Sequence, residues 1–174
     1  MALFILDTRN QKDGFVIQAL LKRGHTILRS KLPWGDIAVS TDITKVIDIK
    51  SSGGGLIELA RNRMSKDRDR MKREILECFQ NNGEITFLCF EPNMTRIEDI
   101  ANWKVPCFSR WYKDPAKRGK PRTSVNPETL MKSIRTMCEP NHYMPGKTVG
   151  FQFATKENCG EIIENILLGG NNNG

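Results

Sequence analysis

Residues that bind zinc or form disulfides are scarce in this chain. Its 174 residues include two histidines and five cysteines, and no two cysteines form a C-x-x-C pair. Structural zinc needs four such ligands at close spacing, and an odd number of scattered cysteines does not suggest a disulfide framework. We therefore expect reduced thiols and no zinc cluster. A cysteine–histidine nucleophile pair is left open as an alternative, although no pattern brings the two residue types together.

Long apolar runs and nucleotide-binding fingerprints are also absent. No run approaches the roughly 20 apolar residues of a membrane-spanning helix. The first residues lack the basic region and cleavage site of a signal peptide and are predicted to form a strand. The glycines at 53–55 are not followed by Gly-Lys-Ser or Gly-Lys-Thr, so they do not form a P-loop. We expect no membrane partner, no nucleotide hydrolysis, and a flexible connection at 53–55.

Positive charge, in contrast, is in excess. Lysine and arginine number 27 against 20 aspartates and glutamates, which gives a net charge of +7. A basic balance favours a polyanionic partner, nucleic acid before an anionic membrane surface. Lys66, Arg70 and Arg73 would share one face of a predicted helix, where they either contact phosphates or are simply solvated. A basic excursion at about 92–126 is predicted to bind phosphates through Arg110, Lys117, Arg118, Lys120 and Arg122.

Periodicity and turn residues predict strands that alternate with helices. Strands are expected at 3–8, 26–31, 36–40, 44–50, 84–90 and 148–153. Helices are expected at 14–23, 56–64, 66–81, 95–102, 127–138 and 156–168, with Asp13 capping the first and Asn126 the one at 127. This alternation indicates one α/β domain over 1–168 around a central sheet. The tail at 169–174 is expected to be disordered.

The most informative chemical pattern is a set of charged residues on two predicted strands. Asp48 and Lys50 are two positions apart in an apolar, β-branched strand, so their side chains would project from the same face. Asp36 begins the neighbouring strand of the predicted hairpin. Buried charges are costly without partners. Two carboxylates beside an ammonium would suit Mg²⁺ and an attacking water, whereas a solvated surface pair is the plain alternative.

Four charged motifs follow one another along the chain. They are Asp7-Thr8-Arg9, Gly35-Asp36, Asp48-Ile49-Lys50, and Arg70-Met71 with Glu74. Their order resembles the D-x-R, G-D, E-R-K and R-L-x-x-Q patterns of the nuclease domain of XPF-type structure-specific endonucleases, within the PD-(D/E)XK superfamily. The likeness covers 3–90 well. It covers 128–168 loosely, where the chain is similar to small phage and bacterial versions of the domain.

The resemblance implies a fold, an activity and a cofactor. The fold would be a restriction-endonuclease-like α/β fold, a central mixed sheet flanked by helices. The activity would be metal-dependent hydrolysis of DNA phosphodiester bonds at branched, flapped or otherwise structured sites, in DNA repair or recombination. The cofactor would be Mg²⁺, for which Mn²⁺ could substitute. A cytoplasmic location, on the nucleoid or in a phage-infected bacterial cell, goes with this activity.

The resemblance also implies roles for single residues. The catalytic residues would be Asp36, Asp48, Lys50 and Arg70. The metal would be bound by Asp36, Asp48 and the carbonyl of Ile49, with Asp7 close by as support or as an additional ligand. Lys50 would orient the attacking water and stabilise charge on the phosphate, helped by Arg70.

Three positions depart from the family pattern. Asp48 replaces a glutamate, Ile49 an arginine and Glu74 a glutamine. The tandem helix-hairpin-helix module of XPF-type enzymes is not among the 174 residues. We expect DNA affinity to come from the basic excursion, a homodimer or a partner protein. The alternatives are a catalytically inactive DNA-binding module of the same fold and a basic protein–protein adaptor.

Overall fold

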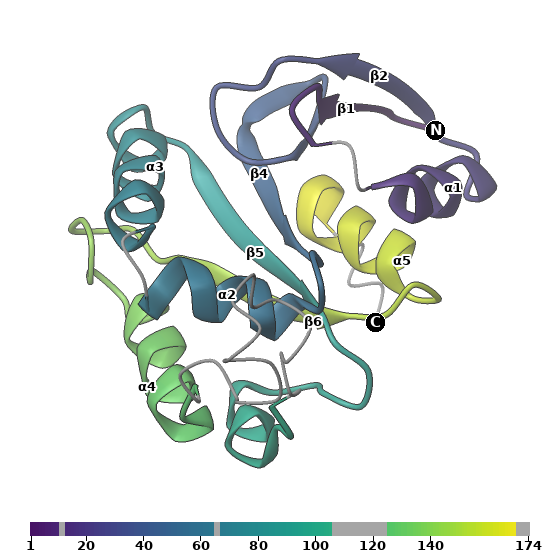
Figure 1. Ribbon diagram of the computed structural model, residues 1–174. Helices are drawn as coiled ribbons and strands as arrows, with labels where there is room; N and C mark the ends of the chain where they lie inside the picture. The colour runs from purple at the N-terminus through teal and green to yellow at the C-terminus, as the bar shows by residue number, and fades with distance from the viewer. Residues whose placement is uncertain (11–12, 65–66, 106–124, 170–174) are drawn as a thin grey trace, which may run out of the picture.

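A mixed sheet of six strands forms the centre of the described chain (Figure 1). The computed structural model describes residues 1–10, 13–64, 67–105 and 125–169. The strands are β1 (Leu3–Asp7), β2 (Thr26–Ser30), β3 (Ile37–Val39), β4 (Asp42–Lys50), β5 (Glu84–Phe90) and β6 (Gly150–Ala154). Their order is β2-β1-β3-β4-β5-β6, with β3 antiparallel to both neighbours and the other pairs parallel. The predicted hairpin is therefore present as β3 and β4.

Helices cover both faces of this sheet. They are α1 (Gly14–Lys22), α2 (Gly55–Met64), α3 (Arg68–Gln80), α4 (Pro127–Met137) and α5 (Cys159–Glu164), with the 3₁₀ helix η1 (Ile97–Asn102) and the π-helix η4 (Asn165–Gly169). Figure 1 shows α1 and α5 on one face and α2, α3 and α4 on the other. The predicted α/β arrangement is confirmed. No helix in the described ranges is long and apolar enough to span a membrane.

Side chains alternate between two hydrophobic cores along the central strands. On β4, Val46 packs with α2, α3 and α4, whereas Ile47 packs with α1 and α5. On β5, Phe87 belongs to the core beneath α2, α3 and α4, and Leu88 belongs to the core beneath α1 and α5. These strands are apolar on both sides because both faces of the sheet are covered. Charged residues at the end of β4 therefore lie between two apolar layers.

The two predicted helix caps have different outcomes. Asn126 caps α4 as predicted, since its Oδ1 accepts the N–H of Thr129 at 3.1 Å. Asp13 occupies the N-cap position of α1 as predicted, and its carbonyl accepts the N–H of Val16 at 2.9 Å, but its side chain makes no capping hydrogen bond. Its backbone, at φ −103° and ψ 16°, is not in the extended conformation typical of a capping residue. Its buried carboxylate instead forms an ion pair with Arg29 at 2.6 Å, because an unpaired buried charge would be costly.

The last predicted helix is shorter and composite. It was expected over 156–168, but α5 begins at Cys159, after a turn in which the Asn158 side chain accepts the N–H of Thr155 at 2.7 Å. It changes to the π-helical η4 at Asn165. The turn holds the chain away from the helix for three residues, which the apolar spacing does not reveal.

Several predictions concern residues outside the described ranges. The predicted tail is described only at Gly169, and the basic excursion is described only over 92–105 and 125–126. The predicted phosphate-binding residues outside the described ranges are Lys66, Arg110, Lys117, Arg118, Lys120 and Arg122. Their assignment stays a prediction.

Candidate active site

The end of β4 carries a buried ion pair. Asp48 and Lys50 are 5% and 8% exposed, and their side chains share the face of Val46, beneath α2, α3 and α4. The Nζ of Lys50 lies 2.5 Å from the Oδ1 of Asp48 and 5.4 Å from the ring centroid of Phe87. The period-2 spacing of the strand thus brings a carboxylate and an ammonium together in a largely apolar setting.

Asp36 is held beside this pair by backbone hydrogen bonds to two strands. Its N–H donates to the carbonyl of Ile47 at 2.8 Å, and its carbonyl accepts the N–H of Asp7 at 2.8 Å. Its Oδ2 accepts the N–H of Ile49 at 2.6 Å. Asp36 therefore lies between β1 and β4, where the antiparallel pairing of β3 places it next to Asp48.

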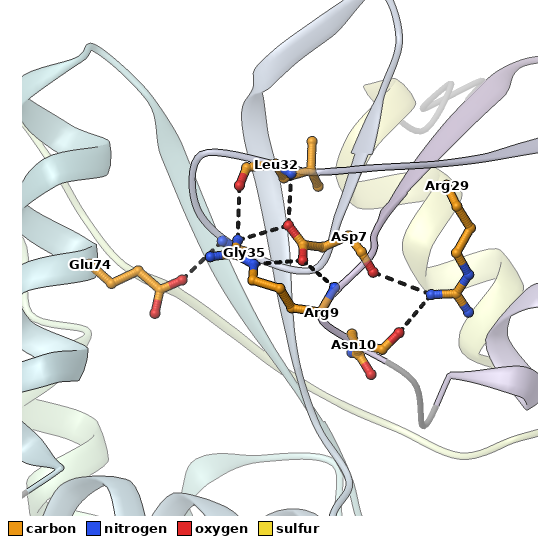
Figure 2. A network of polar contacts seen from close by, with 7 residues as sticks. All are labelled: Asp7, Arg9, Asn10, Arg29, Leu32, Gly35 and Glu74. Atoms are coloured by element: carbon orange, nitrogen blue, oxygen red, sulfur yellow. Dashed lines mark hydrogen bonds and ion pairs between the residues drawn. The ribbon is translucent and has the colours of Figure 1, made fainter.

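Gly35 fixes the turn that presents Asp36. It has φ +67°, a conformation that favours glycine, and a Cβ there would lie 2.8 Å from the Cγ2 of Val46. Its N–H donates to the Oε1 of Glu74 at 3.0 Å, a contact that Figure 2 shows reaching across from α3. A helix thirty-nine positions away in sequence thus anchors the turn, through the residue that departs from the family's glutamine.

Asp7 serves as the centre of a polar network rather than as an open ligand (Figure 2). Its Oδ1 accepts the Nε and backbone N–H of Arg9, each at 2.7 Å. Its Oδ2 accepts the Nη2 of Arg9 and the N–H of Leu32, also at 2.7 Å. Both oxygens are thus engaged. The carboxylate ties the end of β1 to the segment before Gly35 and so supports the position of Asp36.

An open cleft of about 740 Å³ brings these elements together. It is lined by Asp7, Asp48, Ile49 and Lys50 from the strands, by Asp36 from the turn before β3, and by Glu58, Arg70, Arg73 and Glu74 from α2 and α3. Asp48 and Lys50 are buried, whereas Arg70 and Arg73 are exposed. The cleft therefore has a mainly acidic, desolvated interior and basic side chains near solvent.

Burial and nearby negative charge raise the proton affinity of the two central carboxylates. Burial, with the charge of Asp48, raises the pKa of Asp36 to about 8. Burial also raises the pKa of Asp48 to about 6, against the opposing effect of Lys50. Burial would lower the pKa of Lys50, but Asp48 raises it above its ordinary value, so this side chain is an ammonium. When both are ionised, the two carboxylates carry more negative charge than the one ammonium of Lys50 can compensate.

The donor atoms at this position fit a hard divalent cation. The Oδ1 of Asp48 is buried and has no partner in the described chain besides Lys50. Among the described residues, no three histidine, cysteine, aspartate or glutamate side chains come together as a ready-made metal cage. Mg²⁺ usually keeps several waters and takes only one or two carboxylates from the protein. Two carboxylates in an open cleft meet that requirement.

Glu58 belongs to the cleft although sequence reasoning did not select it. One of its oxygens, Oε2, accepts the N–H groups of Ser51 and Ser52 at 2.9 and 2.7 Å, which ties down the loop after Lys50. Its negative charge also raises the pKa of Asp48, as does that of Glu74. An acidic residue a few positions past the D-x-K triplet, at the start of the next helix, was the available clue.

The side chain of Ile49 explains its departure from the family pattern. It is 5% exposed and packs with α1 and α5, on the face opposite Asp48. Its backbone N–H holds Asp36. An apolar side chain suits that core, so the substitution leaves the charged face of β4 unchanged.

Comparison with solved structures shows the fold of the chain. XPF from Aeropyrum pernix is similar at a TM-score of 0.56 and 13% identity, over 94% of this chain and 62% of that one. XPF from Aeropyrum pernix in complex with DNA is similar at a TM-score of 0.57 and 13% identity, over 97% and 64%. The chain thus spans less than two thirds of either structure. The predicted restriction-endonuclease-like fold, in its XPF form, is confirmed.

Comparisons of sequence add no family assignment. No protein-family model matches the chain. No curated protein matches it at a significant level. Function is therefore inferred from the fold and from the geometry of the cleft.

Proposed function

We propose that this chain is a metal-dependent endonuclease that hydrolyses phosphodiester bonds of DNA at branched, flapped or otherwise structured sites. The observation that carries the proposal is the pair of acidic side chains Asp36 and Asp48, held with Lys50 inside an open cleft. Arg70 and Arg73 line the same cleft and are exposed to solvent. The shared fold with XPF, described in complex with DNA, supports DNA as the polyanion.

The proposed cofactor is Mg²⁺, with Mn²⁺ able to substitute. Asp36 and Asp48 would hold it through carboxylate oxygens, and Ile49 through its carbonyl. When bound, a divalent cation supplies positive charge that makes water a better nucleophile and offsets charge on the phosphate. The raised pKa values of both aspartates mark a place where added positive charge is favourable.

The residues of the chain have separable roles in the proposed reaction. The water gives up one proton as its oxygen bonds to phosphorus, and the leaving oxygen takes up one proton as its bond to phosphorus breaks. Lys50 is cationic and orients the attacking water beside Asp48. Arg70 donates to the phosphate, for which a guanidinium has suitable paired donors. Asp7 and Glu74 act through others, since they hold the turn that carries Asp36.

The central test is Asp48→Asn, which keeps the size of the side chain and removes its charge. We expect at least about a hundredfold less cleavage across single-stranded, flapped, forked and four-way DNA with Mg²⁺, on the scale of losing one electrostatic group. DNA binding measured without Mg²⁺ should be retained. Asp42→Asn is the matched control, because Asp42 is exposed at the opposite end of the same strand.

Two outcomes would contradict the proposal. If the Asp48→Asn protein still cleaves DNA in a preparation free of contaminating nucleases, Asp48 does not belong to an active site. No Mg²⁺- or Mn²⁺-dependent cleavage by the unaltered chain on any substrate would favour the inactive DNA-binding module. A basic protein–protein adaptor predicts, in addition, no salt-dependent affinity for DNA.

A further inference from the structure

A second cleft, of about 500 Å³, adjoins the candidate active site. It is formed at the C-terminal ends of β5 and β6, by α1 and by the loop after β4. Ser51 and Ser52 line both clefts, so the two share an edge. Ser52 is two residues from Lys50, a chain distance of at most about 7 Å. A strand with a phosphate at Lys50 can therefore place its adjoining nucleotides in the second cleft.

Two aromatic rings form a wall of this cleft. Phe15 from α1 and Phe90 at the end of β5 meet edge to face, with centroids 4.8 Å apart and planes at 76°. Each is partly exposed and packs on the core beneath α1 and α5, which fixes its orientation. The Nζ of exposed Lys156 lies 5.7 Å from the centroid of Phe15. Aromatic faces with a nearby cation are the usual platform for unpaired bases.

The charges around the cleft favour a base over a phosphate inside it. Lys156 is the cation among its lining residues, and Glu91 and Glu157 are the anions. The Oε1 of Glu91 accepts the N–H of Leu56 at 3.0 Å, so a carboxylate already occupies the N-terminus of α2. A phosphate in this cleft would be repelled by the carboxylates of Glu91 and Glu157, whereas an uncharged base would not be repelled. The volume is within the range of small-ligand pockets.

We propose that the second cleft stacks an unpaired nucleobase of the DNA strand whose phosphodiester bond lies in the candidate active site. This inference rests on the proposed endonuclease function and specifies its substrate class as DNA with unpaired nucleotides next to the cleaved bond. A paired base is stacked inside the duplex and cannot reach Phe15 unless it is extruded. The loop at 51–53 then separates the cleaved phosphate from the stacked base.

The test measures binding of uncleaved DNA by the Asp48→Asn protein. The substrate is a duplex with a single-stranded overhang that carries 2-aminopurine or an abasic residue at each overhang position in turn. At one position, 2-aminopurine fluorescence should be quenched on binding. An abasic residue at that position should weaken binding about five- to a hundredfold, the range of one stacked base.

Variants assign the effect to the second cleft. Phe15→Leu keeps an apolar side chain in the core. It should remove most of the difference in binding affinity between base-containing and abasic overhangs. Lys156→Ala should reduce it. Lys132→Ala is the control, since Lys132 is an exposed lysine that lines neither cleft, and it should leave the difference unchanged.

Equal affinity for base-containing and abasic overhangs at every position would overturn the proposal. So would an unchanged base dependence in a Phe15→Leu protein whose thermal unfolding is cooperative. Failure of the endonuclease function would be seen separately, as absence of Mg²⁺-dependent cleavage by the unaltered chain while the overhang still binds.

Discussion

Aspartates of this one sheet experience opposite electrostatic environments. Burial alone would raise the pKa of Asp7, but hydrogen bonds from Arg9 and Leu32 hold it below its ordinary value. Burial raises the pKa of Asp36 and Asp48 because neither receives comparable donation. Asp7 therefore stays ionised and structural, while the other two exchange protons near neutral pH. That difference identifies which carboxylates can respond to an added cation.

The first expected consequence concerns the pH dependence of activity. Protons compete with a divalent cation for Asp48, with a pKa of about 6, and for Asp36, with a pKa of about 8. Cleavage at limiting Mg²⁺ should therefore rise with pH across about 6 to 8, and higher Mg²⁺ should move the rise to lower pH. Initial rates on a flapped substrate from pH 5.5 to 9 measure this. A flat profile would contradict it.

The second consequence concerns stability without a metal. The pKa of Asp36 is raised on folding, so its contribution to stability is present below the ordinary value of 3.8 and is lost as pH rises through about 8. In EDTA, the free energy of unfolding should fall over that interval. Asp36→Asn should reduce the fall and raise stability at pH 8.5 by at least about 1.4 kcal/mol, the equivalent of one pKa unit, while cleavage is lost.

Urea unfolding at pH 5 and pH 8.5 measures the effect. Asp42→Asn is the control, because hydrogen bonds from Thr44 lower the pKa of Asp42. A carboxylate whose pKa is lowered on folding contributes stability that is lost as pH falls, and not as pH rises. A fall between pH 5 and 8.5 that is as steep in Asp36→Asn as in the unaltered chain would contradict the assignment.

At the scale of elements, the turn before β3 determines whether the site forms. Gly35→Ala would place a Cβ at φ +67°, 2.8 Å from Val46 and 3.2 Å from the carbonyl of Ile47. Gly146→Ala is a matched control, with φ +76° and no atom within 4 Å. Gly146→Ala should lower the free energy of unfolding by about 1–2 kcal/mol, the penalty of the left-handed conformation alone. Gly35→Ala should cost clearly more and should also reduce cleavage, because the turn carries Asp36.

Thermal unfolding and cleavage rates of the two alanine variants provide the comparison. Equal destabilisation of Gly35→Ala and Gly146→Ala would show that the segment around Val46 can move aside. Full cleavage by Gly35→Ala would mean that Asp36 does not depend on this turn.

Local patterns predicted the elements better than they predicted partners. Period-2 spacing placed Asp48 and Lys50 on one face, and the fold comparison bears out the α/β class. Spacing did not predict that Asp13 would pair with Arg29, because that ion pair depends on how α1 packs against β2. The contact of Glu74 with Gly35 also joins distant segments. Such pairings arise from tertiary packing, which a single sequence does not encode in its local periodicity.

At the scale of the whole molecule, net charge and cleft charge have opposite signs. The chain carries +7, yet the interior of the cleft is mainly acidic, with the cationic side chains of Arg70 and Arg73 at its exposed part. DNA would therefore be attracted over a long range and admitted to the acidic interior only where arginines or a cation compensate its phosphates. Affinity and cleavage should thus depend on different residues of α3 and β4.

Salt dependence tests this division. The logarithm of DNA affinity should fall linearly with the logarithm of salt concentration, and each phosphate contact contributes about 0.9 to the slope. Arg70→Gln and Arg73→Gln should each lessen the slope by about that amount, whereas Asp48→Asn should not lessen it. Titrations from low to moderate salt without divalent cations measure the slopes, with Lys132→Gln as a control on α4. An unchanged slope in a protein that carries both Arg70→Gln and Arg73→Gln would show that the DNA phosphates contact other residues. DNA would then not approach Asp48 through this cleft.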